Sequence, residues 1–314
     1  MTDQSPHWPE LDWPAWRDTA IALQLRTQII GKVRLALTPW LNHSWHVPLY
    51  VSARGLTTSA IPIGDRILEI EFDLLHDRLV FMTSDGRSRG IGLNPGSIAH
   101  FHETVIACLT ELDLPATFDG TPSEMADVPP FAEDTADRPY DADAVRAFWR
   151  ALIQVSRVFG QFRTGFLGKA SPVHFFWGSF DLAVTRFSGR AAPTHPGGFP
   201  GLPDAVTRDA YSHEEASVGF WPGSDAWPHA AFYAYAYPAP DHYAEAHVSP
   251  AAASWNAGLG EFLLPYDAVR TAPDPDAALL GFCQSTYDAA ADLGQWDRSA
   301  LECAPGRAGI PRHV

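Results

Sequence analysis

The chain has 314 residues, of which 46% are hydrophobic and 19% are charged. This length suits one large domain or two modest ones, and the apolar share excludes a wholly disordered chain. No apolar run approaches the roughly 18 residues that a membrane-spanning helix needs. The acidic N-terminal stretch MTDQSPHWPELDW lacks the hydrophobic segment of a secretory signal. We therefore expect a soluble, cytoplasmic protein with no membrane partner.

The net charge of the chain indicates which classes of binding partner to expect. The 22 Lys and Arg residues against 37 Asp and Glu give a net charge of −15, and so acidic a surface repels nucleic acid. We expect a small-molecule ligand instead. The lysines are Lys32 and Lys169, and genome composition explains this bias toward arginine. Cys108, Cys283 and Cys303 have no C-x-x-C spacing, which indicates reduced core thiols rather than disulfides or a zinc site.

Helical and extended patterns follow one another twice along the chain. In the first round, residues 13–37 have the apolar spacing of one long helix that Pro39 should end. Extended segments separated by turn signals occupy residues 46–93. Ser97 then caps a predicted helix that ends near residue 113.

The second round begins after residues 119–140, which are acidic, Pro-rich and poor in large aliphatic residues and so predict a linker or an extended arm. Asp141 should cap a helix on which apolar residues recur every three or four positions. The later elements are expected as a strand at 173–187, a long loop at 188–206, strands at 215–221, 230–237 and 260–266, and a helix from Asp274 or Asp276 to about residue 293.

These patterns predict an α+β fold with two similar helix–antiparallel-sheet–helix halves. The halves would span residues 1–118 and 141–303, joined by the linker at 119–140 and followed by a C-terminal tail at 304–314. A cleft between the halves is the natural place for a pocket.

The similarity of the halves suggests an internal duplication about a pseudo-twofold axis. A shift of 127 residues places Tyr50 on Trp177 without a gap from the preceding helix. The same shift places Arg54 on Asp181, so these opposite charges are predicted to pair across the axis. The alternative is that helix–meander–helix is a common layout for any α+β protein.

Familiar catalytic signatures are missing: the chain has no G-x-G-x-x-G, Walker loop, H-E-x-x-H or G-x-S-x-G. What remains are polar residues in aromatic settings. His43 and His46 could share a metal ion if their segment makes a helical turn. Structural histidines flanked by tryptophan are the favoured interpretation of this pair.

The stretch 171–181 puts a histidine and an aspartate on an apolar strand. Strict alternation points His174 and Asp181 to opposite faces, which excludes local pairing unless Gly178 marks a bulge or a close approach. Each group would cost several kcal/mol if it were buried without a partner, so each should have one elsewhere.

Two polar clusters follow. His195 precedes Gly197 in the long loop and is either a ligand-binding residue or an exposed turn histidine. In the cluster 211–215, a strand would place His213 and Glu215 on one face with Glu214 opposite, whereas a turn would let His213 and Glu214 reach one site. A solvated acidic turn is the alternative.

An aromatic ladder occupies the strand predicted at 230–237. Tyr233, Tyr235 and Tyr237 share one face of this strand, with alanines between them. The ladder predicts either a wall for a flat ligand or cross-strand packing.

Several stretches resemble those of a bacterial family catalogued as domain of unknown function number 5996. They are NHSWHVPLYVSARGLTTS, SPVHFFWGSFDLAVTRFSGR, HPGG, YSHEEASVGFWPG, FYAYAYP and GEFLLPYDAVR. The resemblance covers nearly the whole chain and implies no particular fold or activity. Its hallmarks fall on His46, Arg54, His174, Asp181, His195, His213 and Glu214.

The leading hypothesis is an enzyme that acts on a small anionic or aromatic molecule between the two halves, with acid–base or metal chemistry. A divalent metal is compatible with these residue types. The predicted catalytic residues are His174, His213, Glu214 and Asp181. The predicted substrate-binding residues are His46, Arg54, Lys169, Arg190, His195, Trp177 and Tyr235. The alternative is a non-catalytic binding module with an aromatic pocket.

Three cations are candidates to anchor an anionic group of the substrate, namely Arg54, Lys169 and Arg190. Lys169 has a second interpretation. It follows the predicted helix that begins at Asp141, and a lysine there can cap the last helical carbonyls.

Overall fold

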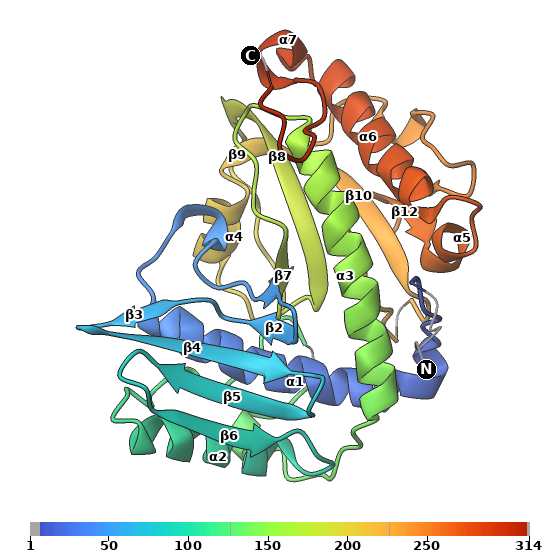
Figure 1. Cartoon of the computed structure of the whole chain (residues 1–314). Coiled ribbons are helices and arrows are strands. Elements are labelled where there is room, and N and C mark those ends of the chain that lie inside the picture. Colours follow the sequence, from blue (N-terminus) through green and yellow to red (C-terminus); the bar gives the residue numbers. More distant parts are fainter. Residues whose placement is uncertain (1–6, 126, 226, 313–314) are drawn as a thin grey trace.

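The computed structural model describes residues 7–125, 127–225 and 227–312, which form two antiparallel sheets with helices packed around them (Figure 1). The long helices lie where the sequence predicts them, at α1 (Trp13–Leu37), α2 (Ile98–Glu111), α3 (Ala142–Thr164) and α6 (Pro275–Leu293). The side chains of Ser97, Asp141 and Asp274 cap three of them by accepting first-turn backbone N–H groups. Shorter helices are α4 (Asp204–Ala210), α5 (Tyr266–Arg270), α7 (Arg298–Leu301) and the 3-10 turns η1 (Asn42–Ser44), η2 (Phe131–Glu133) and η3 (Tyr243–Glu245).

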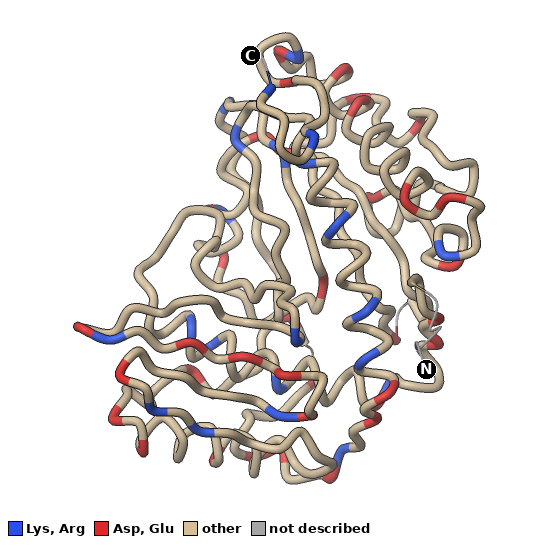
Figure 2. The backbone as a smooth tube through the Cα atoms, in the orientation of Figure 1, with Lys and Arg blue, Asp and Glu red and all other residues tan. Residues whose placement is uncertain are grey.

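The first sheet has the order β1-β2-β4-β5-β6, and β3 pairs with β4 beside this path. On β4, Leu68, Ile70 and Phe72 are buried in alternation with half-buried polar residues, so one face of the sheet packs on the core. Helices α1 and α2 run along this sheet (Figure 1). Charges of both signs are interspersed along its strands (Figure 2). The strands are β1 (Tyr50–Val51), β2 (Gly55–Thr57), β3 (Ile61–Ile63), β4 (Arg66–Asp73), β5 (Arg78–Thr83) and β6 (Ser88–Gly92).

The second sheet has the order β11-β12-β10-β9-β8-β7, and α3 and α6 pack across one of its faces (Figure 1). Its strands are β7 (His174–Phe176), β8 (Asp181–Ala191), β9 (His213–Trp221), β10 (Ala231–Tyr237), β11 (Ser254–Asn256) and β12 (Glu261–Pro265). Every second residue of β8 faces the helices, as shown by Arg186, which donates to the carbonyl of Phe162 on α3. The intervening residues face the opposite side.

The prediction of one continuous strand over residues 173–187 is wrong. The chain turns back at residues 177–180, where Phe180 adopts a left-handed φ of 60°, and β7 pairs with β8 so that Phe176 lies opposite Asp181. In this hairpin His174 lies opposite Ala183, two residues along the same ladder. His174 and Asp181 therefore share a face. Strict alternation would point them apart, but the register changes at the turn that contains Gly178, a position where the sequence left such a change open.

The two sheets meet where Leu49 and Phe175 exchange both backbone hydrogen bonds, at 2.8 and 2.7 Å. One hydrophobic core cluster runs through both halves, with Trp16 of α1 against Phe148 of α3 at 5.2 Å between ring centroids. The segment predicted as a linker is packed as well, because Phe131 is fully buried within it.

The α+β class is confirmed, whereas the internal duplication is not. Counted from β7, the strands of the second sheet lie in chain order as far as β10; β12 then lies next to β10, and β11 is the edge strand. The first sheet has no such exchange of consecutive strands. Within the described residues, no helix combines the length and apolar character that crossing a membrane requires.

Candidate functional site

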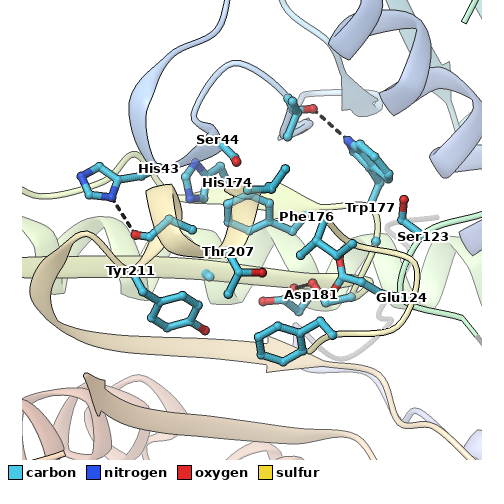
Figure 3. A pocket seen from close by; sticks show the side chains of 18 of the residues that line it. His43, Ser44, Ser123, Glu124, His174, Phe176, Trp177, Asp181, Thr207 and Tyr211 are labelled. Atoms are coloured by element: carbon cyan, nitrogen blue, oxygen red, sulfur yellow. Dashed lines mark hydrogen bonds between the residues drawn. The ribbon is translucent and has the colours of Figure 1, made fainter. Parts of the chain in front are cut away.

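A cavity of about 710 Å³ lies against the face of the second sheet that α3 and α6 leave free. Strand alternation builds its floor, because Asp181, Ala183 and Thr185 of β8 point into it. Neighbouring strands β7, β9, β10 and β12 contribute further lining residues. The remaining walls come from α1, from residues 40–47 and 119–124, and from residues 199–211. Figure 3 shows side chains from several of these segments converging on the space. Its volume suits a small molecule.

Besides Asp119, whose carboxylate pairs with Lys32, four carboxyl groups line this cavity, each from a different part of the chain: Glu124, Asp181, Glu215 and Glu261. Part of Glu124 is exposed to solvent, but burial of its carboxyl group together with the charge of Asp181 raises the pKa of Glu124 to about 7. The same two causes raise the pKa of Glu261 to about 7. Groups that hold or release a proton near neutral pH are suited to acid–base chemistry.

Asp181 is the most constrained of the four. Its carboxylate accepts hydrogen bonds from the hydroxyls of Tyr233 and Ser179, and only 4% of the residue is exposed. Burial raises the pKa of Asp181, although these two hydrogen bonds oppose the rise. Gly219 makes the Tyr233 contact possible, because a Cβ at position 219 would lie 2.1 Å from the tyrosine ring. The sequence prediction of a partnered aspartate is confirmed.

Glu215 lies next to a pair of tyrosine hydroxyls. Tyr235 is 3.4 Å from the Glu215 carboxyl and 3.3 Å from the hydroxyl of Tyr211. Glu215 is 5% exposed, and burial raises its pKa to about 8. Because β9 begins at His213, the strand alternative is the one the structure adopts, and Glu215 rather than Glu214 faces the cavity.

His174 presents an imidazole to the cavity (Figure 3). The residue is 1% exposed, and within the described chain its Nδ1 has no hydrogen-bond partner. Burial lowers its pKa to about 3, so the ring is neutral at physiological pH. Among the described residues, the partner that the sequence predicted for His174 is not found at this nitrogen, which the surrounding protein encloses.

Both lysines of the chain lie beside this cavity. Lys32 of α1 lines it and donates to Asp119 at 2.6 Å and to Ser123 at 3.0 Å. Lys169 donates to His43 Nε2 at 2.5 Å and packs behind two lining rings, with its ammonium 5.3 Å from Trp45 and 4.9 Å from Phe187.

Other predicted binding residues stand at the cavity wall or just behind it. Trp177 lines the cavity while its Nε1 donates to the carbonyl of Val47 at 2.9 Å (Figure 3). His195 lies outside the lining and stacks on Tyr211 with 4.6 Å between centroids. His46 is buried against Trp40, outside the lining.

Two predicted catalytic residues are not part of the cavity lining. His213 lies beside His43, with 5.5 Å between the rings. Glu214 points to the other face of β9, where Arg190 contacts it at 2.6 Å and Ser188 donates to it at 2.8 Å. Arg190 is thereby directed away from the cavity as well.

Arg54 also lies elsewhere. Its guanidinium contacts the buried carboxylate of Asp73 at 2.5 Å, in the first sheet, and Arg78 approaches the same carboxylate at 3.1 Å. The predicted pair between Arg54 and Asp181 is therefore wrong: each residue finds its partners within its own sheet.

The metal suggested by the histidines and carboxylates finds little support. Within residues 7–125, 127–225 and 227–312, no group of three or more His, Cys, Asp and Glu side chains is placed to hold a metal ion. The left-handed backbone of His43 separates it from His46, so the two do not share the face of a helical turn.

Nearly all of these residues lie in a region of the chain that matches a protein family. The model of a family described as "Family of unknown function (DUF5996)" matches residues 8–303. The chain belongs to the DUF5996 family. Neither the comparison with curated proteins nor the one with solved structures gives a match.

Several cavity residues of this DUF5996 chain were not among the predicted site residues. Glu124 lies in the segment predicted as a linker, and Glu261 lies in the family-like stretch GEFLLPYDAVR without having been singled out; only the fold brings them to Asp181. Glu215 and Tyr233 could have been found, because alternation along two neighbouring strands places both on the face that holds Tyr235.

Proposed function

We propose that this DUF5996 protein is an enzyme that binds a small molecule in the cavity and transfers protons through Glu215. The observation that carries the proposal is a carboxyl group that is 5% exposed and yet forms part of the wall of a 710 Å³ cavity. A catalytic acid or base needs a pKa near the working pH and direct access to the substrate. Glu215, with a pKa of about 8, meets both requirements.

The surroundings of Glu215 support a proton-transfer role. The hydroxyls of Tyr235 and Tyr211 extend from its carboxyl as a chain of donors and acceptors, at 3.4 and 3.3 Å. The neutral ring of His174 lines the same cavity. In this proposal Glu215 gives or takes the proton, and His174 and Asp181 bind polar groups of the substrate.

A non-catalytic binding module is the second candidate. The observation in its favour is a stack of lining rings: Trp221 lies 4.9 Å from Tyr233, and Tyr233 lies 6.1 Å from Tyr235, with interplanar angles of 19° and 9°. Such a wall would hold a flat ligand without any reaction.

Depletion of metabolites distinguishes the two candidates. Purified protein is incubated with a small-molecule extract of bacterial cells, and mass spectrometry follows which compounds disappear. We expect wild type to consume at least one compound that Glu215→Gln leaves intact. Glu103→Gln, on the exposed side of α2, serves as the control variant.

Glu214→Gln tests the assignment made from sequence, because Glu214 is the neighbouring carboxyl and faces Arg190. Consumption that survives Glu215→Gln and stops with Glu214→Gln would assign the chemistry to Glu214. Compounds that bind and are recovered unchanged from wild type would identify a binding module.

A further inference from the structure

The charges that line the cavity do not balance. Five carboxyl groups line it, those of Asp119, Glu124, Asp181, Glu215 and Glu261, and the described lining residues include one ammonium, that of Lys32, and no guanidinium. Lys32 is already paired with Asp119 at 2.6 Å. The other lysine, Lys169, stands behind the lining rings and donates to His43. The cavity is therefore acidic, and no cation of the described lining residues is left for the four carboxyl groups other than Asp119.

Glu124 and Glu261 show this imbalance most clearly. Among the described residues, no ion pair or side-chain hydrogen bond reaches either carboxyl group, and the charged residue that acts on each of them is Asp181, another carboxyl. Figure 3 shows Glu124 and Asp181 next to each other at one end of the cavity. Neighbouring carboxylates in a buried cavity repel one another. The repulsion is relieved when a carboxyl group keeps its proton or when a cation binds beside it.

The cavity has two further features that point to a ligand. Glu215 and His174 are both more than nine-tenths buried, and both line the space. The stacked rings of Trp221 and Tyr233 lie on the same wall as Asp181, to which Tyr233 donates. The faces of such rings attract positive charge.

We propose that the ligand of this cavity is a small organic cation, an amine or quaternary ammonium compound with an apolar body. Its nitrogen would lie among Glu124, Asp181 and Glu261, and its apolar body would lie against Trp221 and Tyr233. The inference rests on the proposed function in one respect, namely that a small molecule occupies the cavity. It replaces the anionic substrate expected from sequence, since Arg54 and Arg190 lie outside.

Three probes that share a benzene ring and differ in charge test this inference. They are benzyltrimethylammonium, benzyl alcohol and benzenesulfonate, and their binding is measured by calorimetry and by tryptophan fluorescence. We expect the cation to bind at least about tenfold more tightly than the alcohol, as a charge-assisted contact of about 1.4 kcal/mol gives, and the sulfonate not to bind.

Glu124→Gln and Glu261→Gln locate the binding site. We expect each variant to lose about tenfold in affinity for the cation and to keep its affinity for the alcohol. Glu103→Gln, the control on α2, should bind all three probes as wild type does. Circular dichroism establishes that each variant is folded, and the substitutions preserve side-chain volume.

The possible outcomes separate this inference from the proposed function. If benzyl alcohol or benzenesulfonate binds as tightly as the cation, the inference is overturned while small-molecule binding stands. Cation binding that is unchanged in both Gln variants also overturns it. If none of the probes binds at millimolar concentration, the cation inference fails, and the metabolite-depletion experiment decides the proposed function independently.

Discussion

The ammonium of Lys169 lies 2.5 Å from Nε2 of His43, while Nδ1 of the same ring lies 2.7 Å from the carbonyl of Ala210. His43 is therefore the neutral tautomer that donates through Nδ1 and accepts from Lys169 through Nε2. These contacts connect the segment before β7 to η1 and to the last residue of α4. Lys169 acts here through His43 and two aromatic rings and not as a cap of α3.

Replacing Lys169 should change the titration of His43. Burial lowers the pKa of His43, and the charges of Lys169 and His213 lower it further. We expect Lys169→Met to raise the pKa of His43, because the substitution removes a positive charge and keeps most of the side-chain volume. NMR titration of the imidazole resonances measures this shift. An unchanged pKa would mean that the ammonium does not approach the ring in solution.

Asp73 should stabilise the protein in a pH-dependent way. Burial tends to raise its pKa, but hydrogen bonds from Arg54, His76 and Arg78 outweigh this and hold the pKa at about 2, below the ordinary 3.8. We expect Asp73→Asn to lower the free energy of unfolding at pH 7 by about 1–2 kcal/mol, since the partly exposed guanidiniums are screened by solvent.

The sign of this pH dependence follows from the lowered pKa. The contribution of Asp73 is complete above its unfolded value near 4 and is lost as the pH falls toward 2. Urea unfolding at several pH values should show wild type and Asp73→Asn converging over that interval. A difference that persists at pH 2 would assign the effect to packing instead of charge.

Glu215 should make the stability of the protein depend on pH in the direction opposite to that of Asp73. Its folded pKa of about 8 lies above the ordinary 4.5, chiefly because of burial, so the unfolded chain releases this proton more readily. The stability of wild type should therefore fall as the pH rises from about 5 to 8. We expect Glu215→Gln to be more stable than wild type at pH 9, by as much as about 4 kcal/mol, and similar to it at pH 4. Thermal melts at these two pH values test the order, and equal stability at both would place Glu215 in contact with water.

Gly219 should be required for the position of Tyr233. A Cβ at residue 219 would lie 2.1 Å from the Tyr233 ring, so Gly219→Ala must displace the ring and break its hydrogen bond to Asp181. We expect a loss of about 1–3 kcal/mol in the free energy of unfolding. In a Tyr233→Ala background the same substitution should cost much less, and this double-mutant cycle measures the coupling. Additive effects would show that the two positions do not interact.

The sequence by itself determined the helices and most of the strands. Helix α1 spans Trp13–Leu37 as its apolar spacing predicts, and Ser97, Asp141 and Asp274 cap the helices that follow. These features are local, because capping and periodicity depend on residues within a few positions of one another. The sequence also predicted a pocket lined by aromatic, histidine and carboxyl side chains, and the lining of the cavity contains these residue types.

The tertiary structure decided which polar groups meet. The run from Phe175 to Phe180 is apolar enough to be one strand, so its alternation concealed the hairpin that puts His174 and Asp181 on one face. Glu124 and Glu261 reach Asp181 only through the packing of distant segments, and Glu214 is directed to Arg190 by the pleat of β9. Contacts between segments far apart in the chain depend on how sheets and loops pack, and residue spacing does not encode them.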